Sequence, residues 1–198
     1  MKYISVFCGS SSGNESIFAT QAALLGKMIA RRGYGIVYGG AHVGLMGAVA
    51  DGALEENGGV IGVIPGFLKQ KELGHRKITK LHVVETMHER KALMNELSDA
   101  VIALPGGYGT MEELFEMLAW AQLALHRKPI GLLNTEGYYD PLTGMLEKMM
   151  EKGFLKDEHK GLLIVESDVE ILLNKIELLA PLKNDKGFEV KQMANSVR

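Results

Sequence analysis

Short apolar runs alternate along the chain with longer segments in which apolar residues recur every three or four positions. The runs are rich in valine and isoleucine and contain almost no charge, which is typical of strands covered on both faces. Turn-forming residues, mostly glycine and proline, stand next to most of them. This pattern predicts seven strands, at residues 3–8, 35–40, 60–65, 81–85, 100–105, 128–133 and 161–165.

The segments between these runs have the spacing of amphipathic helices. In the first of them, one helical face collects Ile17, Gln21, Leu24, Leu25 and Met28. Gly33 follows where it can cap the C-terminus of that helix. Alternating strands and helices predict an α/β fold, a three-layer Rossmann-like sandwich whose parallel sheet of about seven strands is flanked by helices. We expect one domain over residues 1–180 and a polar, frayed tail over 181–198.

The composition is that of a globular protein and gives no electrostatic case for a polyanionic partner. Hydrophobic residues make up 46% of the 198 residues and charged residues 23%, with a formal net charge of −2. A chain without excess positive charge has no general attraction for nucleic acid or an anionic membrane, and we expect neither as a partner. Any anion must therefore be bound by a local site.

The single cysteine, Cys8, excludes a disulfide within the chain and a cysteine-based zinc site. It lies in an apolar run, so we expect a buried structural thiol, the alternative being a reactive nucleophile. His42, His75 and His126 show no metal-ligand spacing, and we expect no metal. The N-terminal apolar segment is too short for a signal peptide and no run is long enough to span a membrane, which predicts a cytoplasmic protein.

Three glycine-rich turns follow predicted strands, at residues 8–14, 39–47 and 105–110. Ligands of open parallel sheets bind beyond the carboxyl ends of the strands, so we expect these turns to surround the site. The longest polar segment between predicted elements, residues 66–80, is placed to overhang that site as a lid.

The turn at 105–110, with the sequence PGGYGT, is the strongest candidate for anion binding. Glycines permit positive φ angles and close approach of the backbone to a ligand. A helix beginning near Gly109 or Thr110 would add free N–H groups and the positive end of its dipole, which suits a phosphate. The alternative is an ordinary tight turn with Thr110 as the N-cap. The sequence matches neither a dinucleotide fingerprint nor a Walker A loop.

The helix after this turn has two apolar sides. We expect the main stripe to face the sheet, formed by Met111, Leu114, Phe115, Leu118, Gln122 and Leu125. Glu113 lies nearly opposite, on a side shared with Met117, Trp120 and Ala124. A second apolar side predicts contact with a partner subunit, with Glu113 at the edge of the pocket. For Glu112 two interpretations stay open: an acid favoured by the helix dipole, or a ligand contact.

A second cluster lies at residues 86–97. Thr86 and Glu89 form a capping box, and Arg90 falls in the middle of an inward stripe that contains Met87, Met94 and Leu97. A buried arginine needs an anionic partner, either an intramolecular carboxylate or a phosphate or ribose bound beside Lys91. Because the strands on either side of this helix are consecutive, we expect Arg90 near the turn at 105–113. His88 is expected to be a surface residue.

Met87-His88-x-Arg90-Lys91 and the PGGYGTMEE segment ending at Glu113 closely resemble the LONELY GUY (LOG) family. Its members are cytokinin riboside 5′-monophosphate phosphoribohydrolases, long mislabelled as lysine decarboxylases. The resemblance extends to about residue 180 and includes FCGSS, YGGAHVGLMG, GVIP and WAQL. One departure is Ala41, where many relatives have a third consecutive glycine.

The resemblance implies hydrolysis of the N-glycosidic bond of N6-substituted adenosine 5′-monophosphates, releasing the free base, cytokinin or adenine, and ribose 5-phosphate. It implies that Arg90 and Glu113 are catalytic, that neither a metal nor a cofactor is needed, and that the protein is a homodimer. The implied substrate-binding residues are Glu72, Lys91, Gly106, Gly107, Tyr108, Gly109, Thr110, Met111 and Glu112.

Two other functions remain alternatives. A non-catalytic carrier of a nucleotide or of the molybdenum cofactor would share the fold and the glycine loop, but the presence of both Arg90 and Glu113 favours an enzyme. A pyridoxal-phosphate lysine decarboxylase is disfavoured, because the chain is short and no lysine has the context of a Schiff base.

Overall fold

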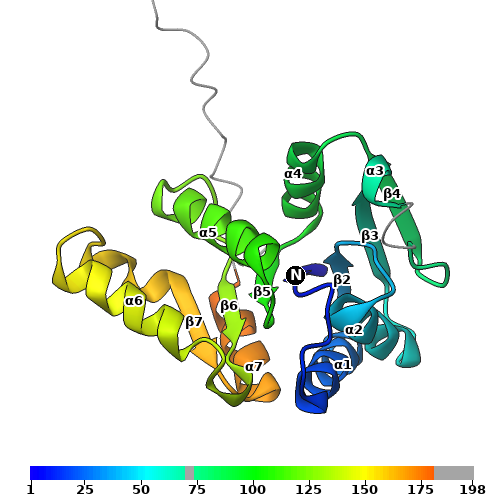
Figure 1. The fold of residues 1–198 in the computed structure, drawn as a ribbon, viewed down its shortest axis with the longest axis horizontal. Coiled ribbons are helices and arrows are strands. Elements are labelled where there is room, and N and C mark those ends of the chain that lie inside the picture. The colour runs from blue at the N-terminus through cyan, green and yellow to red at the C-terminus, as the bar shows by residue number, and fades with distance from the viewer. Residues whose placement is uncertain (70–73, 181–198) are drawn as a thin grey trace, which may run out of the picture.

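All seven predicted strands form one parallel sheet in the computed structural model, which describes residues 1–69 and 74–180 (Figure 1). Each strand pairs in parallel with its neighbours, and the predicted strand positions are confirmed to within two residues at most ends. The strands are β1 (Tyr3–Phe7), β2 (Gly35–Tyr38), β3 (Val60–Pro65), β4 (Lys80–Val84), β5 (Ala100–Ala103), β6 (Ile130–Leu133) and β7 (Leu163–Glu166).

The strand order is β4-β3-β2-β1-β5-β6-β7, so the chain reverses direction across the sheet between β1 and β5. A ligand of an open α/β sheet binds at such a reversal. The strands β4 and β5 are consecutive in the chain, but three strands separate them in the sheet. Helix α4 (Met87–Leu97) connects them by crossing the sheet, and it packs against β3, β2 and β1.

Helices cover both faces of the sheet (Figure 1). On one face lie α1 (Ser16–Arg31), α2 (Gly44–Glu55) and α7 (Val169–Leu179), and on the other α4, α5 (Tyr108–Gln122) and α6 (Asp140–Glu151). Each set buries a hydrophobic cluster against the sheet. The three-layer α/β class is confirmed. The short helices are α3 (Gly66–Lys69), η1 (Thr135–Gly137) and η2 (Asp157–Leu162).

Helix α1 ends as predicted but is turned slightly about its axis. Gly33 has φ +77° and its N–H donates to the Ala30 carbonyl, which caps the helix. The fully buried face consists of Ala22, Leu25, Gly26 and Ile29. A Cβ on Gly26 would lie 2.1 Å from the Val49 carbonyl oxygen of α2, so close helix approach, rather than apolar content alone, selects this face.

The described part of the predicted lid is attached to the turn after β2. The His75 N–H donates to the Gly40 carbonyl, and its buried ring lies 3.2 Å from the Asp51 carboxylate of α2. The central part of this segment with Glu72, and the tail at 181–198, lie outside the described residues. Within the described ranges, no helix has the length and apolar character needed to cross a membrane.

Candidate active site

The three glycine-rich turns come together where the sheet reverses between β1 and β5. The Gly9 N–H donates to the Pro105 carbonyl at 3.1 Å, and the Gly9 carbonyl accepts from the Leu45 N–H at 3.1 Å. A Cβ on Gly44 would lie 2.3 Å from the backbone of Ser10, so these turns are in close backbone contact. Packing of this kind requires residues without side chains, as the sequence pattern indicated.

The phosphate loop, defined here as residues 105–110, leads directly into α5. The helix begins at Tyr108 with Gly107 as its N-cap, and Thr110 is a buried residue of its first turn. Thr110 is therefore not the N-cap. The first helical bond runs from the Met111 N–H to the Gly107 carbonyl, at 3.1 Å. Among the described residues, no acceptor faces the N–H groups of residues 107–110, which are the donors expected to bind an anion.

The glycines of this loop serve two different purposes. None of them has a positive φ, so conformational freedom does not explain them. A Cβ on Gly106 would lie 2.1 Å from Thr110 Oγ1 and 2.9 Å from the Gly9 nitrogen, so packing explains that glycine. At Gly107 and Gly109 a Cβ would meet nothing within 4 Å. The fold does not require glycine at these two positions, which leaves open space over the start of the helix.

Arg90 of α4 and Glu113 of α5 form a buried ion pair beside this loop. Arg90 Nη2 lies 3.7 Å from Glu113 Oε1, and each side chain is only 9% exposed. The distance is longer than a hydrogen bond, and Arg90 Nε is buried without a partner among the described residues. The expected proximity of Arg90 to the turn is confirmed, and it results from the crossing of α4 over the sheet.

The guanidinium of Arg90 fits against the turn after β2. A Cβ on Gly39 would lie 2.2 Å from Arg90 Nη2 and 2.7 Å from Met46 Sδ. Only glycine leaves room at that position. The turn therefore fixes the direction in which Arg90 points.

Burial raises the pKa of Glu113 to about 7. The Arg90 charge opposes this shift, while the neighbouring Glu112 and Glu116 carboxylates add to it. A carboxyl group with a pKa near neutrality can hold or accept a proton under physiological conditions, which is what acid–base catalysis requires.

Lys91, beside Arg90, pairs with two carboxylates of α5. Its Nζ forms a short contact with Glu112 and lies 3.1 Å from Glu116 Oε1. The predicted binding residues Lys91 and Glu112 thus contact each other. Glu116 was not singled out from the sequence, although its i, i+4 relation to Glu112 places both on one helix side.

The predicted orientation of α5 is only partly correct. Leu114 is fully buried as expected, and Met111 and Leu118 also pack against the core cluster, but Phe115 and Leu125 are exposed. The buried residues of α5 are Thr110, Glu113, Leu114 and Met117. The side that carries Glu113 therefore also points inward, toward Arg90 of α4, and Trp120 is partly buried against the same cluster. Apolar content alone could not show that a charged residue faces the interior.

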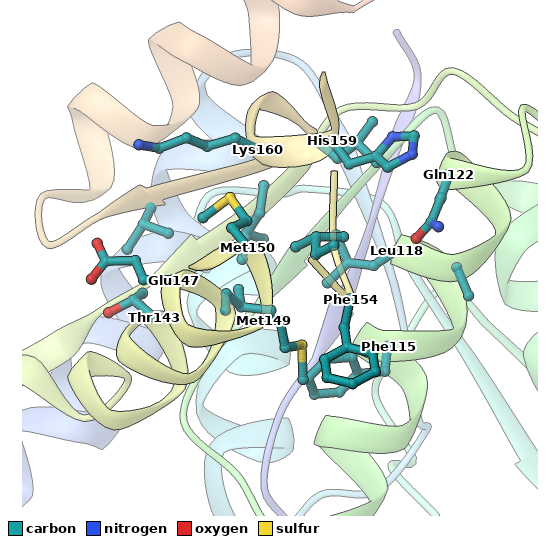
Figure 2. A pocket seen from close by; sticks show the side chains of 16 residues that line it. Phe115, Leu118, Gln122, Thr143, Glu147, Met149, Met150, Phe154, His159 and Lys160 are labelled. Atoms are coloured by element: carbon teal, nitrogen blue, oxygen red, sulfur yellow. The ribbon is translucent and has the colours of Figure 1, made fainter. Parts of the chain in front are cut away.

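Part of the stripe expected to face the sheet instead faces a groove of about 470 Å³ between α5, α6 and the η2–β7 segment. Phe115, Leu118 and Gln122, which we had expected against the sheet, line it from α5 (Figure 2). Met149 and Phe154 contribute from the opposite wall. The groove contains neither Arg90 nor Glu113 and is separate from the ionic site.

Two tyrosines missed in the sequence bind the loop and the strand before it. The Tyr138 hydroxyl donates to the Gly106 carbonyl and the Tyr139 hydroxyl to the Leu104 carbonyl, both at 2.6 Å. Their position immediately beyond β6, at the carboxyl edge of the sheet, was the available signal.

The other residues considered in the sequence analysis lie outside the ionic site or do not have the properties of a catalytic group. Cys8 is buried, and burial together with the Glu113 charge raises the pKa of its thiol, so it is not an activated nucleophile. His126 Nε2 lies 3.0 Å from the Met117 carbonyl. Within residues 1–69 and 74–180, no three His, Cys, Asp or Glu residues are grouped to hold a metal ion. Met111 is partly buried, and Tyr108 projects from the loop at 97% exposure.

Known proteins resemble the chain over most of its length. A family model described as "Possible lysine decarboxylase" matches residues 46–176. The chain is 48% identical over 170 residues to a cytokinin riboside 5′-monophosphate phosphoribohydrolase of Rhodococcoides fascians, with 85% of this chain and 86% of that protein covered. The chain belongs to the LOG family. It is also 41% identical over 199 residues to the phosphoribohydrolase LOG1 of Arabidopsis thaliana, covering 98% and 93% of the two chains.

Solved structures share the fold. The molybdenum cofactor carrier protein of Chlamydomonas reinhardtii superimposes with a TM-score of 0.66 at 24% identity, covering 90% of this chain and 97% of that one. The molybdenum cofactor binding protein of Rippkaea orientalis gives a TM-score of 0.67 at 23% identity, covering 90% and 96%. At such identities the likeness shows a common fold and nothing further.

Proposed function

We propose that this LOG-family protein hydrolyses the N-glycosidic bond of adenosine 5′-monophosphates, including N6-substituted ones, to free base and ribose 5-phosphate. The observation that carries the proposal is the buried Arg90–Glu113 pair beside a helix start whose N–H groups have no described acceptor. The names of relatives at 41% and 48% identity support the same reaction.

The phosphate loop is the proposed site for the 5′-phosphate. Free N–H groups, the helix dipole and the open space over Gly107 and Gly109 favour a doubly charged anion there. Anchoring the phosphate positions the sugar at the carboxylate, so binding energy remote from the reacting bond contributes to catalysis.

Glu113 is the proposed general base. As the bond from C1′ to the base nitrogen breaks, positive charge develops on the ribose ring. The Glu113 carboxylate stabilises that charge and takes a proton from the attacking water, whose oxygen bonds to C1′. The departing base takes the electron pair of the broken bond and gains a proton. Arg90 holds the nucleotide, using donors such as Nε that lack a described partner.

Lys91 of α4 and Glu112 of α5 are proposed to contact the nucleotide. Their mutual pairing, extended to Glu116, keeps the buried lysine charged and its ammonium near the loop. Tyr108, Met111, Glu72 and the loop glycines complete the proposed binding set. The same proposal includes a cytoplasmic location. It also includes the expectation that the protein binds neither nucleic acid nor membranes.

We further propose a homodimer that covers the apolar groove between α5 and α6. Phe154 is 86% exposed there, and Phe115 adds further exposed apolar surface. Since α5 carries both Glu113 and one wall of the groove, a second copy bound there would lie close to the site. Contiguous exposed apolar surface of this kind is typical of interfaces.

The test is release of free base and ribose 5-phosphate from AMP and from an N6-substituted AMP, with the matching nucleosides as controls. We expect cleavage of the monophosphates and almost none of the nucleosides, because the nucleosides lack the anchoring group. Equal turnover of adenosine and AMP would contradict the phosphate anchor. Stable binding of either nucleotide without any cleavage would support the carrier alternative.

A further inference from the structure

We propose that Tyr138 is a positioning residue for the phosphate loop, which sets the loop's affinity for the 5′-phosphate. The inference rests on the proposed function and deepens it. Tyr138 lies on the turn that follows β6 and η1, on a segment that carries none of the proposed catalytic or binding residues. Its hydroxyl donates to the Gly106 carbonyl at 2.6 Å.

This hydrogen bond fixes the orientation of one peptide group in the loop. The carbonyl of Gly106 and the N–H of Gly107 belong to the same planar trans peptide and point in opposite directions. Holding the carbonyl toward Tyr138 therefore directs the Gly107 N–H away from Tyr138. That N–H has no acceptor among the described residues. A loop with a preset donor loses less entropy when an anion binds.

Tyr138 also contacts the turn on the other side of the sheet reversal. Its ring meets the ring of Phe18 edge-on, with centroids 6.1 Å apart and planes at 76°. Phe18 lies in the first turn of α1 and packs beside Gly13, where a Cβ would be 3.0 Å from the Phe18 ring. Tyr138 thus joins the turn after β1 to the turn after β5, between which the ligand is proposed to bind.

A comparison with Tyr139 distinguishes a role in positioning the loop from a role in the stability of the fold. Both tyrosines donate to a backbone carbonyl at the same distance. Tyr139 is buried and bonds to Leu104, adjacent to β5, whereas Tyr138 is 44% exposed and bonds to the loop itself. Losing the Tyr139 hydroxyl leaves a buried carbonyl unpaired, while the carbonyl near Tyr138 lies beside solvent. No other side chain of a described residue forms a hydrogen bond with residues 105–110.

The experiment compares Tyr138→Phe with Tyr139→Phe in the full chain. For Tyr138→Phe we expect the KM for AMP and the inhibition constant of inorganic phosphate each to rise about 3- to 10-fold, the effect of one hydrogen bond, with kcat within about twofold. Tyr139→Phe should lower the thermal midpoint and leave both constants within about twofold of wild type. Phe18→Leu, which removes the ring contact, should raise the phosphate constant by a smaller factor.

Two results would overturn the inference. One is a Tyr138→Phe protein whose phosphate constant and KM match wild type, and the other is a fall in kcat with KM unchanged. Calorimetric titration with inorganic phosphate makes the test independent of turnover. A wild-type protein that binds phosphate but releases no base would refute the proposed function, while the difference between the two variants would still decide the role of Tyr138.

Discussion

Arg90 Nη2 of α4 and Glu113 Oε1 of α5 face each other across 3.7 Å beside the phosphate loop. The two side chains are buried but not hydrogen-bonded to each other. Removing two charges from water without hydrogen bonds between them costs stability, and such arrangements are found where function requires them. The pair is therefore better explained by a role in binding a ligand, which would supply the missing hydrogen-bond partners, than by a contribution to folding stability.

The activity should depend on pH in the direction set by Glu113. Burial raises the pKa of Glu113 to about 7, so the group is protonated below that pH and cannot accept a proton from water. We expect kcat at saturating AMP to fall as the pH is lowered through about 7 and to level off above it. The measurement is kcat between about pH 5.5 and 9, a range that spans this titration. A flat profile across that range would argue against a base with this pKa.

Adding one methyl group at Gly109 should have opposite effects on the stability of the protein and on its affinity for AMP. A Cβ there meets nothing within 4 Å, and alanine favours a helix over glycine, so Gly109→Ala should raise the thermal midpoint slightly. The methyl group would occupy the space proposed for the phosphate and should weaken AMP binding by about 10-fold or more, because it blocks access to the N–H groups.

Gly144→Ala is the matched control, since Gly144 also lies in a helix and its Cβ would also meet nothing within 4 Å. It should stabilise the protein without changing the KM for AMP. If Gly109→Ala binds AMP as tightly as Gly144→Ala does, the open space over the loop is not the phosphate site.

A charge in the apolar groove should weaken the proposed dimer. Phe154 is exposed in the single chain, so Phe154→Glu should not disturb folding of the monomer, yet it would bury a carboxylate in the interface. We expect wild type to sediment as a dimer at micromolar concentration and the variant to dissociate. Leu178→Glu, 83% exposed on α7 at the other face of the sheet, should remain dimeric. Wild-type protein that sediments as a monomer would contradict this proposal.

The sequence was sufficient to predict the seven strands, because each is a short run with little charge, and glycine or proline stands next to most of these runs. It also predicted the turns of the site, since a backbone approach such as that of Gly44 to Ser10 excludes side chains. The order of the strands in the sheet could not be predicted from the sequence. The distance between β4 and β5 depends on where α4 crosses the sheet, which no local pattern encodes.

The candidate site was only partly predictable for a related reason. Arg90 could be recognised because a charged residue interrupts an apolar stripe. The burial of Glu113 within the chain was not expected, since it depends on Arg90 of α4 lying opposite that side of α5. Tyr138 and Glu116 act through contacts with residues distant in the chain, Gly106 and Lys91, and nothing in their immediate sequence indicates those contacts.

The most direct test of the account is single-turnover release of base by Glu113→Gln, with Glu112→Gln as the control on the same helix turn. The amide keeps the shape of Glu113 but cannot accept the proton of water, so base release should fall by roughly 10²–10⁴-fold while a non-cleavable nucleotide still binds. Glu112→Gln, which weakens the contact with Lys91, should affect binding more than turnover. A Glu113→Gln protein that binds normally and releases base within a few-fold of the wild-type rate would contradict the central claim.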